Sequence, residues 1–377
     1  MNDTAAATEL ERKRRPLRWR RYVVRTAIVT ALYFAMLVYP VVRLIGLVAP
    51  ETELGTLPLL AIIVLPIVLR MLYERRPNAF TRACAAVALT WLGVCFQLFP
   101  LMIVFELANV VFDIPGSVAG WTLIGLIGGI GCIGFLNAQL LHVRSVSIAA
   151  DEGVRGKTLV QVSDVHIGSR SPGLLRRIVA KVNAIDADYV LITGDLIDFA
   201  GISRDQLREL GRLTRPAYFV IGNHERYVDL NAICERLRAL GIRVLRDEYA
   251  IAGPFQFIGV DDADSPDGVA QAIAKIGVSR DHYPVLLYHR PDGFDAAVSH
   301  HIPLTLTGHT HAGQIIPFNF IVKRVYPRFR GLHRLGDSLL YVSPGTGTWG
   351  PVLRFGSRSE ITRIVFGNHN PETDHGT

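Results

Sequence analysis

Five short motifs in this chain of 377 residues carry side chains of the types that bind divalent metal ions. They combine carboxylate, imidazole and amide groups, a mixed oxygen and nitrogen donor set that suits transition metals. In chain order they are residues 164–166 (Asp-Val-His), 194–198 (Gly-Asp-Leu-Ile-Asp), 222–225 (Gly-Asn-His-Glu), His289 and 308–311 (Gly-His-Thr-His). One such motif would mean little, but five in this order predict a two-metal centre.

Each motif follows a short apolar run that is typical of a buried strand. The runs are residues 157–162, 189–193, 217–221, 285–288 and 304–306. Ligands of open α/β sheets bind at the carboxyl ends of the strands. We therefore expect the polar side chains that follow these runs to converge on one rim of the fold.

Amphipathic stretches between the runs predict helices at 172–185, 203–213 and 230–240, and further strands are expected at 255–260, 339–342 and 361–366. Alternating strands and helices indicate a largely parallel sheet that is covered by helices.

The ordered set Asp-x-His, Gly-Asp-x-x-Asp, Gly-Asn-His-Glu, His and Gly-His-x-His resembles the calcineurin-like metallophosphoesterase superfamily. The resemblance covers residues 157–366, and the combined motifs are highly specific. The later segments 311–314, 341–347 and 353–356 resemble the membrane-associated bacterial branch in particular. The resemblance implies an α/β fold, a layered metallophosphoesterase sandwich with helices outside.

By this resemblance, seven residues would hold two divalent metal ions. Asp164, His166 and His311 would bind one ion, Asn223, His289 and His309 would bind the other, and Asp195 would bridge the two. Metals about 3.5–4 Å apart need a shared anionic ligand to offset their repulsion, and a carboxylate supplies one. The donor set suits Mn, Fe, Zn or Co and leaves the metal identity open.

The resemblance also implies two catalytic residues. A metal-bound hydroxide would attack the phosphorus atom. His224 would protonate the leaving alkoxide or stabilise the charge on the phosphoryl group. Asp198 would orient His224 by holding its second ring nitrogen.

Each motif taken alone has a purely structural explanation. Asp164 or Asp195 would more often cap a helix that follows a strand, His289 would be a satisfied core or turn histidine, and residues 308–311 would form a turn. The acidic residues in 261–264 are interpreted as a loop. The remaining histidines match no family position and are interpreted as structural or exposed: His142, His282, His300, His301, His333, His369 and His375.

One position departs from part of the superfamily. Phosphoprotein phosphatases place an arginine that grips the phosphate directly after the second aspartate of Gly-Asp-x-x-Asp, and here that position is Phe199. This difference disfavours a protein-phosphatase role. An apolar residue is compatible with a lipid-bearing or phosphodiester substrate.

The first 142 residues have the composition of a membrane domain. Apolar segments at 27–48, 57–72, 83–105 and 118–141 approach the length of about 20 residues that spans a bilayer, and the second is the shortest. Basic residues precede the first segment and lie between the second and third, whereas the other connections are acidic. This alternation predicts a multi-pass protein of the cell inner (plasma) membrane with both termini and the catalytic domain in the cytoplasm.

We therefore expect a basic cytoplasmic segment at 1–25, a transmembrane domain of about four helices at 26–142, a catalytic domain at 143–367 and a polar tail at 368–377. The four cysteines have no zinc or disulfide spacing and are interpreted as structural. The net charge of +7 lies mostly in the membrane part, so it does not specifically indicate a nucleic-acid partner.

The expected function is that of a membrane-anchored phosphoesterase acting on a phosphomonoester or phosphodiester. A phospholipid or lipid-linked diphosphate is the preferred substrate class, because an anchor concentrates the enzyme on lipid-borne molecules. Two alternatives stay open: a tethered phosphodiesterase for soluble nucleotides, and a non-catalytic membrane sensor with a phosphoesterase fold. The sequence leaves the natural substrate and the oligomeric state open.

Overall fold

The computed structural model describes residues 3–149, 151–199, 202–263 and 265–367. The chain divides into two compact units. The first unit contains the residues up to 71 together with 91–128, and the second contains residues 72–90 and the chain from 129 onward. The expected polar tail at 368–377 lies outside the described residues.

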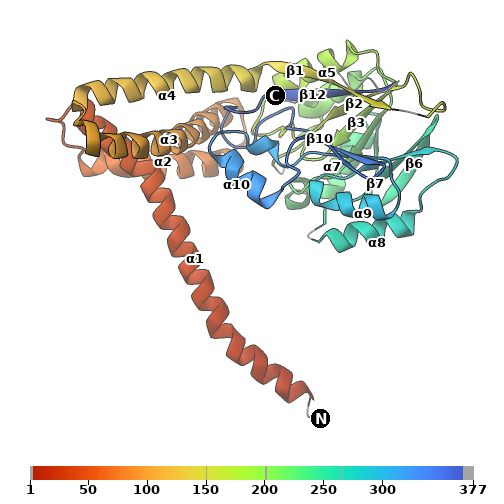
Figure 1. The fold of residues 1–377 in the computed structure, drawn as a ribbon, viewed down its shortest axis with the longest axis horizontal. Coiled ribbons are helices and arrows are strands. Elements are labelled where there is room, and N and C mark those ends of the chain that lie inside the picture. The colour runs from red at the N-terminus through yellow and green to blue at the C-terminus, as the bar shows by residue number, and fades with distance from the viewer. Residues whose placement is uncertain (1–2, 150, 200–201, 264, 368–377) are drawn as a thin grey trace. The chain divides into compact units, whose positions relative to one another are not determined.

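Four long helices open the chain (Figure 1): α1 (Asp3–Val48), α2 (Thr56–Arg75), α3 (Ala79–Phe112) and α4 (Gly116–Gln139). Thr26–Val48 of α1 and the whole of the other three helices are long and apolar enough to cross a membrane. They correspond to the four expected segments. The shortest segment forms a helix of 20 residues even though it contains Pro66.

In the first unit, Arg43, the one arginine of the first apolar segment, forms an ion pair with Glu106. The Arg43 Nε atom lies 2.6 Å from Oε1 of Glu106, and the Tyr39 hydroxyl donates to the same oxygen at 3.2 Å. Pairing reduces the cost of placing charged groups in an apolar helix. Leu98 and Met102, which precede Glu106 in α3, belong to a buried apolar cluster.

Twelve strands build the second unit, with these bounds: β1 (Leu141–Ala149), β2 (Thr158–Val162), β3 (Tyr189–Thr193), β4 (Ala217–Val220), β5 (Ile242–Val244), β6 (Glu248–Ala252), β7 (Phe255–Gly259), β8 (Tyr283–Leu287), β9 (Leu304–Thr307), β10 (Gly331–Leu335), β11 (Ser338–Val342) and β12 (Ser359–Gly367). They form two six-stranded sheets, ordered β1-β12-β2-β3-β4-β5 and β10-β11-β9-β8-β7-β6. Strands β2 to β5 run parallel, as do β7, β8, β9 and β11, whereas β6 and β10 are antiparallel edge strands.

Helices cover the outer faces of these sheets: α5 (Pro172–Asn183), α7 (Leu230–Arg238), α8 (Pro266–Ile276) and α9 (Phe294–Ser299). Leu159 belongs to the core between the sheets, and its neighbour Val160 belongs to the core beneath α5 and α7. Successive residues of a strand point to opposite faces, so β2 serves both cores. Ile258 packs in a third core with residues of α8 and α9. The expected layered sandwich with helices outside is therefore the observed fold.

Several elements differ from the sequence expectation. The fourth apolar segment was expected to run to residue 141, but α4 ends at Gln139 and Leu141 starts β1, which pairs in parallel with β12. The helix expected at 203–213 is broken into α6 (Arg204–Leu207) and a 3-10 turn, Arg208–Arg212. Strands β5, β6 and β10 and helices α8, α9 and α10 (Phe318–Val325) were not expected. All four cysteines are free.

Candidate metal centre

The polar motifs lie at the carboxyl ends of strands from both sheets. Asp164 and His166 follow β2, Asp195 follows β3, Asn223 follows β4, His289 follows β8, and His309 and His311 follow β9. Both sheets therefore contribute to one site. This is the convergence that strand ends produce in α/β folds.

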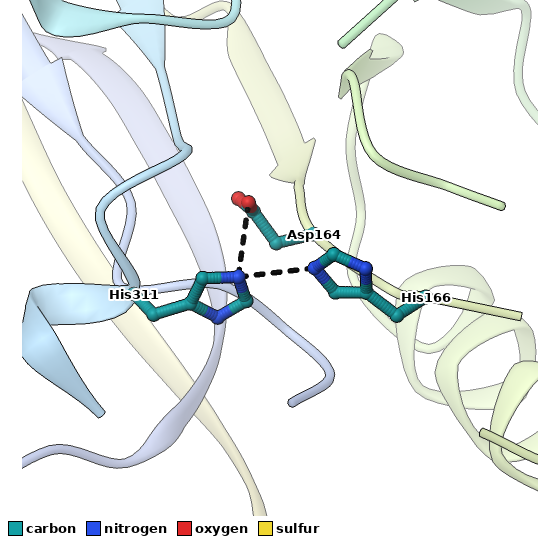
Figure 2. Close-up of side chains that lie close together, drawn as sticks. All are labelled: Asp164, His166 and His311. Carbon is teal, nitrogen blue, oxygen red and sulfur yellow. Dashed lines mark hydrogen bonds and ion pairs between the residues drawn. The ribbon is translucent and has the colours of Figure 1, made fainter. Parts of the chain in front are cut away.

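Asp164, His166 and His311 form the first cluster (Figure 2). The Nε2 atoms of the two histidines are 3.0 Å apart, and His311 Nε2 lies 3.4 Å from Asp164 Oδ1. All three residues are buried. Asp164 and His166 from the loop after β2 and His311 from the loop after β9 point toward one another, so their ligand atoms can share one cation.

Asp195, His289 and His309 form a second cluster. His289 Nε2 lies 3.1 Å from Asp195 Oδ2, and His309 Nδ1 lies 2.9 Å from Oδ1 of Asn223. Burial raises the pKa of Asp164 and the Asp198 carboxylate raises that of His166, and the charge of Asp195 adds to both shifts, so Asp195 also acts electrostatically on the first cluster. The structure thus brings six of the seven expected ligands into two clusters, with Asp195 in the second, and Asn223 contacts that cluster through His309.

The residues present fit the metal ions that the motifs imply. The Nε2 atoms of His166 and His311 face each other at 3.0 Å, and burial followed by the charge of His166 pushes the pKa of His311 well below its ordinary value. Burial also disfavours the protonated form of His166, but the Asp198 carboxylate outweighs it and raises the pKa of His166 to about 9. A shared cation between the two rings would use both lone pairs.

Each of three expected histidine ligands is held through its second ring nitrogen. His166 Nδ1 pairs with Asp198 Oδ1, His289 Nδ1 lies 2.8 Å from the Thr193 carbonyl oxygen, and His309 Nε2 lies 3.0 Å from the Tyr326 hydroxyl. Such partners fix the tautomer and the orientation of a metal-binding imidazole. Tyr326 follows α10 and was not identified from the sequence.

Asp198 contacts two histidines rather than one. Its Oδ1 atom pairs with His166 Nδ1 and lies 3.0 Å from His224 Nδ1. The rings of His166 and His224 meet edge to face at 4.8 Å. Asp198 is buried, whereas one fifth of the His224 side chain is exposed. His224 therefore stands at the border between the ligands and the solvent.

Glu225 braces the loop that carries Asp195. Its buried carboxylate accepts hydrogen bonds from the backbone N–H groups of Asp195 and Ile197, both at 3.0 Å, and from Gly222 at 2.7 Å. A side chain at Gly222 would clash with Asp195, so this loop requires glycine. The sequence contained Glu225 within a motif, but its role becomes visible only in the fold.

Two arginines stand beside the centre and share one carboxylate. Asp262, which has a fully buried side chain, pairs with Arg226 at 3.0 Å and with Arg290 at 2.6 Å. Arg290 directly follows His289, and its charge contributes to lowering the pKa of His309, after burial and the charge of His289. Asp262, in the loop that follows β7, thus holds two guanidinium groups next to the ligands.

Phe199 packs against Tyr73 within the second unit. The two rings meet edge to face with centroids 5.0 Å apart, and the Tyr73 hydroxyl donates to the carbonyl oxygen of Gly168. The position that holds a phosphate-gripping arginine in protein phosphatases is therefore occupied by an aromatic contact over the segment that follows His166.

A third group of possible metal ligands, His166, Asp198 and His224, overlaps the first cluster. The other described histidines lie in none of these three groups: His142, His282, His300, His301 and His333. His369 and His375 lie outside the described residues.

Comparison with known proteins assigns the family. Residues 157–313 match the family model of the calcineurin-like phosphoesterases. An uncharacterized metallophosphoesterase of Aquifex aeolicus is 30% identical over 253 residues, which cover 63% of this chain and 95% of that protein. The chain therefore belongs to the calcineurin-like metallophosphoesterase family.

A relative whose name describes a transmembrane protein is also similar to this chain. A "transmembrane protein with metallophosphoesterase domain" from Danio rerio is 35% identical over 237 residues, which cover 57% of this chain and 54% of that protein. The chain thus matches little more than half of the length of that relative. The crystal structure of phosphopantetheinyl hydrolase from Mycobacterium tuberculosis is similar with a TM-score of 0.31 and 13% identity, over 51% of this chain and 91% of that one. A likeness at this score bears neither on the site nor on the substrate.

Proposed function

We propose that this protein is a membrane-anchored phosphoesterase that hydrolyses a phosphomonoester or phosphodiester with two divalent metal ions. The observation that carries the proposal is the pair of ligand clusters at the strand ends, one around His166 and His311 and one around His289 and His309. Asp195 stands in the second cluster and acts on the charge of the first. Membership in the metallophosphoesterase family supports the same chemistry.

The proposed ligands are Asp164, His166 and His311 for one ion, and Asn223, His289 and His309 for the other, with Asp195 between them. Bound metal ions would supply Lewis acidity and lower the pKa of water. The protein contributes the position of these groups, because hydrogen-bond partners fix three of the imidazole rings.

His224 is the proposed general acid. Asp198 holds its Nδ1 atom at 3.0 Å, so Nε2 is the ring atom that can donate a proton to a leaving alkoxide. Because Asp198 also contacts His166, it couples the position of the acid to that of a metal ligand. His224 and Asp198 would act without themselves binding either of the two proposed metal ions.

Arg226 and Arg290 are the proposed contacts for the negative charge of the substrate. Arginine recognises phosphate oxygens through its planar fork of donors. Asp262 holds both guanidinium groups beside the ligands. The two arginines would take the role of the phosphate-binding arginine of protein phosphatases, whose position Phe199 occupies here.

The proposed substrate is lipid-borne, a phospholipid or a lipid-linked diphosphate, and the proposed location of the catalytic unit is the cytoplasmic face of the inner membrane. Four helices able to cross a membrane support an anchored enzyme. Tethering enzyme and substrate to one surface raises their effective concentration.

The test is a substrate panel for the full-length protein in vesicles, supplied with Mn²⁺, Zn²⁺, Fe²⁺ or Co²⁺. The panel contains bis(4-nitrophenyl) phosphate, 4-nitrophenyl phosphate, a cyclic nucleotide, a vesicle phospholipid and a lipid-linked diphosphate. We expect metal-dependent hydrolysis of an artificial ester and of one lipid-borne compound. Turnover of the nucleotide without any lipid turnover would favour the tethered nucleotide phosphodiesterase. Metal binding without hydrolysis of any compound would favour the non-catalytic sensor.

A further inference from the structure

Helix α10 leaves large apolar side chains exposed. Phe320 is 66% exposed, Ile321 56% and Val325 63%, and none of the eight residues of the helix is buried. Ile316, which precedes the helix, is also exposed. Single exposed apolar residues are ordinary, but a contiguous group in one short segment marks an interaction surface.

All the charged residues of the same segment, apart from histidine, are basic. Residues 316–335 contain five lysines and arginines and no aspartate or glutamate. Lys323 and Arg324 lie in the last turn of α10 among the exposed apolar residues. Asp295 pairs with only one of these basic residues, Arg328, at 2.9 Å. The segment therefore carries a positive charge even after this pairing is counted. Basic and apolar side chains together are typical of helices that lie in a membrane interface.

Both flanks of α10 are fixed to the metal-centre loop. After the helix, Tyr326 contacts His309 and the Thr310 hydroxyl donates to the Phe329 carbonyl oxygen at 2.6 Å. Before it, the Gln314 side chain exchanges hydrogen bonds with the backbone of Trp349, at 2.9 and 3.0 Å. The exposed helix is thus part of the rigid surround of the site rather than a loose tail.

We infer that this surface docks on a bilayer leaflet that contains anionic lipid. It is called the α10 surface here and comprises Ile316, Phe320, Ile321, Lys323, Arg324 and Val325. The apolar side chains would enter the acyl boundary while the cationic groups contact the headgroups. Trp349, which is half exposed and bound to Gln314 ahead of α10, is of the type that enriches at membrane interfaces.

Two observations favour a bilayer over another occupant. A second copy of the chain would bring two basic segments together, and like charges across an interface oppose association. A single residue, Leu140, separates β1 from the end of α4, a helix apolar enough to cross a membrane. The strands of the catalytic unit therefore begin directly after a helix that is apolar enough to cross a bilayer, which keeps this unit tethered close to a leaflet.

This inference goes beyond the proposed function, because docking can be measured without turnover. Full-length protein is placed, one copy per disc, in nanodiscs of phosphatidylcholine alone or with about one third phosphatidylglycerol. Amide hydrogen exchange of residues 316–330 is followed by mass spectrometry. We expect exchange to be about threefold or more slower in the anionic discs, and this ratio to shrink at high salt.

Two double variants test the surface. Lys323→Gln with Arg324→Gln should bring the exchange ratio close to one, and Phe320→Ser with Ile321→Ser should do the same. Because each variant is compared with itself in the two lipids, any fraying of α10 cancels. The control is Tyr249→Ser with Ile251→Ser, two exposed apolar residues on β6, at the opposite edge of the sheet from β10. The control should keep the wild-type ratio.

A ratio near one in the wild-type protein would overturn the inference. So would a ratio that the Lys323→Gln and Arg324→Gln variant leaves unchanged. Protection that appears only in discs holding two copies would assign the surface to a second chain instead of the bilayer.

Discussion

Five of the seven proposed ligands hold a left-handed backbone that side chains rarely adopt. The values of φ are +54° for Asp164, +57° for His166, +49° for Asp195, +69° for His309 and +50° for His311. Such conformations cost free energy and persist where surrounding contacts enforce them, which happens mainly at functional sites. The buried partners of these residues supply that enforcement.

His224→Ala should separate catalysis from metal binding. His224 contacts Asp198 and stands outside the two ligand clusters, so metal content should stay near normal while kcat falls about 10²–10⁴-fold. The loss should be larger for an alkyl phosphodiester than for a nitrophenyl ester, whose leaving group needs little protonation. His300→Ala, outside the clusters, is the control. Unchanged rates on both esters would remove His224 from the proposed mechanism.

Asp262→Asn should weaken substrate binding more than chemistry. Asparagine keeps the shape and one acceptor oxygen, so the chain should fold, but Arg226 and Arg290 lose the charge that fixes them. We expect KM for a phosphodiester to rise about tenfold or more, with normal metal content and a smaller change in kcat. Asp261→Asn, whose carboxylate pairs with Arg246 instead, is the matched control. A pure kcat loss would show that the arginines do not bind ground-state substrate.

Among the elements, strand ends were the most predictable part of the site. The runs before Asp164, Asp195 and Asn223 are short and apolar, and parallel strands bring their carboxyl ends to one edge. That rule needs only local sequence. It led from five motifs to two clusters, although it indicated one sheet where the structure has two.

The supporting contacts were not predictable, because they join segments far apart in the chain. Asp262 pairs with Arg226, which lies 36 residues away in the chain. Tyr326 contacts His309 from a segment whose sequence shows no periodic pattern that would predict a helix or strand. Strand β1 was hidden for another reason. Its first residue, Leu141, continues the apolar run of α4, so only the pairing with β12 reveals where the helix ends.

Tyr326→Phe should loosen one metal site. The hydroxyl lies 3.0 Å from His309 Nε2 and holds the ring so that Nδ1 faces Asn223. Loss of such a partner typically lowers metal affinity about 10–100-fold. Titration of the purified protein with Zn²⁺ should show one weakened site and one unchanged site, and Tyr249→Phe should behave as wild type. Two sites of wild-type affinity in Tyr326→Phe would contradict a supporting role for α10.

At the scale of the whole molecule, loop charges predict that both termini face the cytoplasm. Fusion of a reporter that fluoresces only in the cytoplasm to the C-terminus should give signal, and a reporter that is active only after export should give none. The reverse result would mean that one of the four helices does not span the membrane or that the catalytic unit faces outward. The helix Thr56–Arg75, the shortest of the four, is where an error in the number of spans is expected.

The most direct measurement is metal content per chain in the purified full-length protein and in Asp195→Asn. Asp195 contributes to the second cluster and its charge acts on the first, so its neutralisation should affect both ions. We predict two ions per chain in the wild type and in the exposed control Asp281→Asn, and fewer than one in Asp195→Asn, with phosphodiester hydrolysis lost in parallel. Two ions bound at wild-type affinity by Asp195→Asn would contradict a shared two-metal centre.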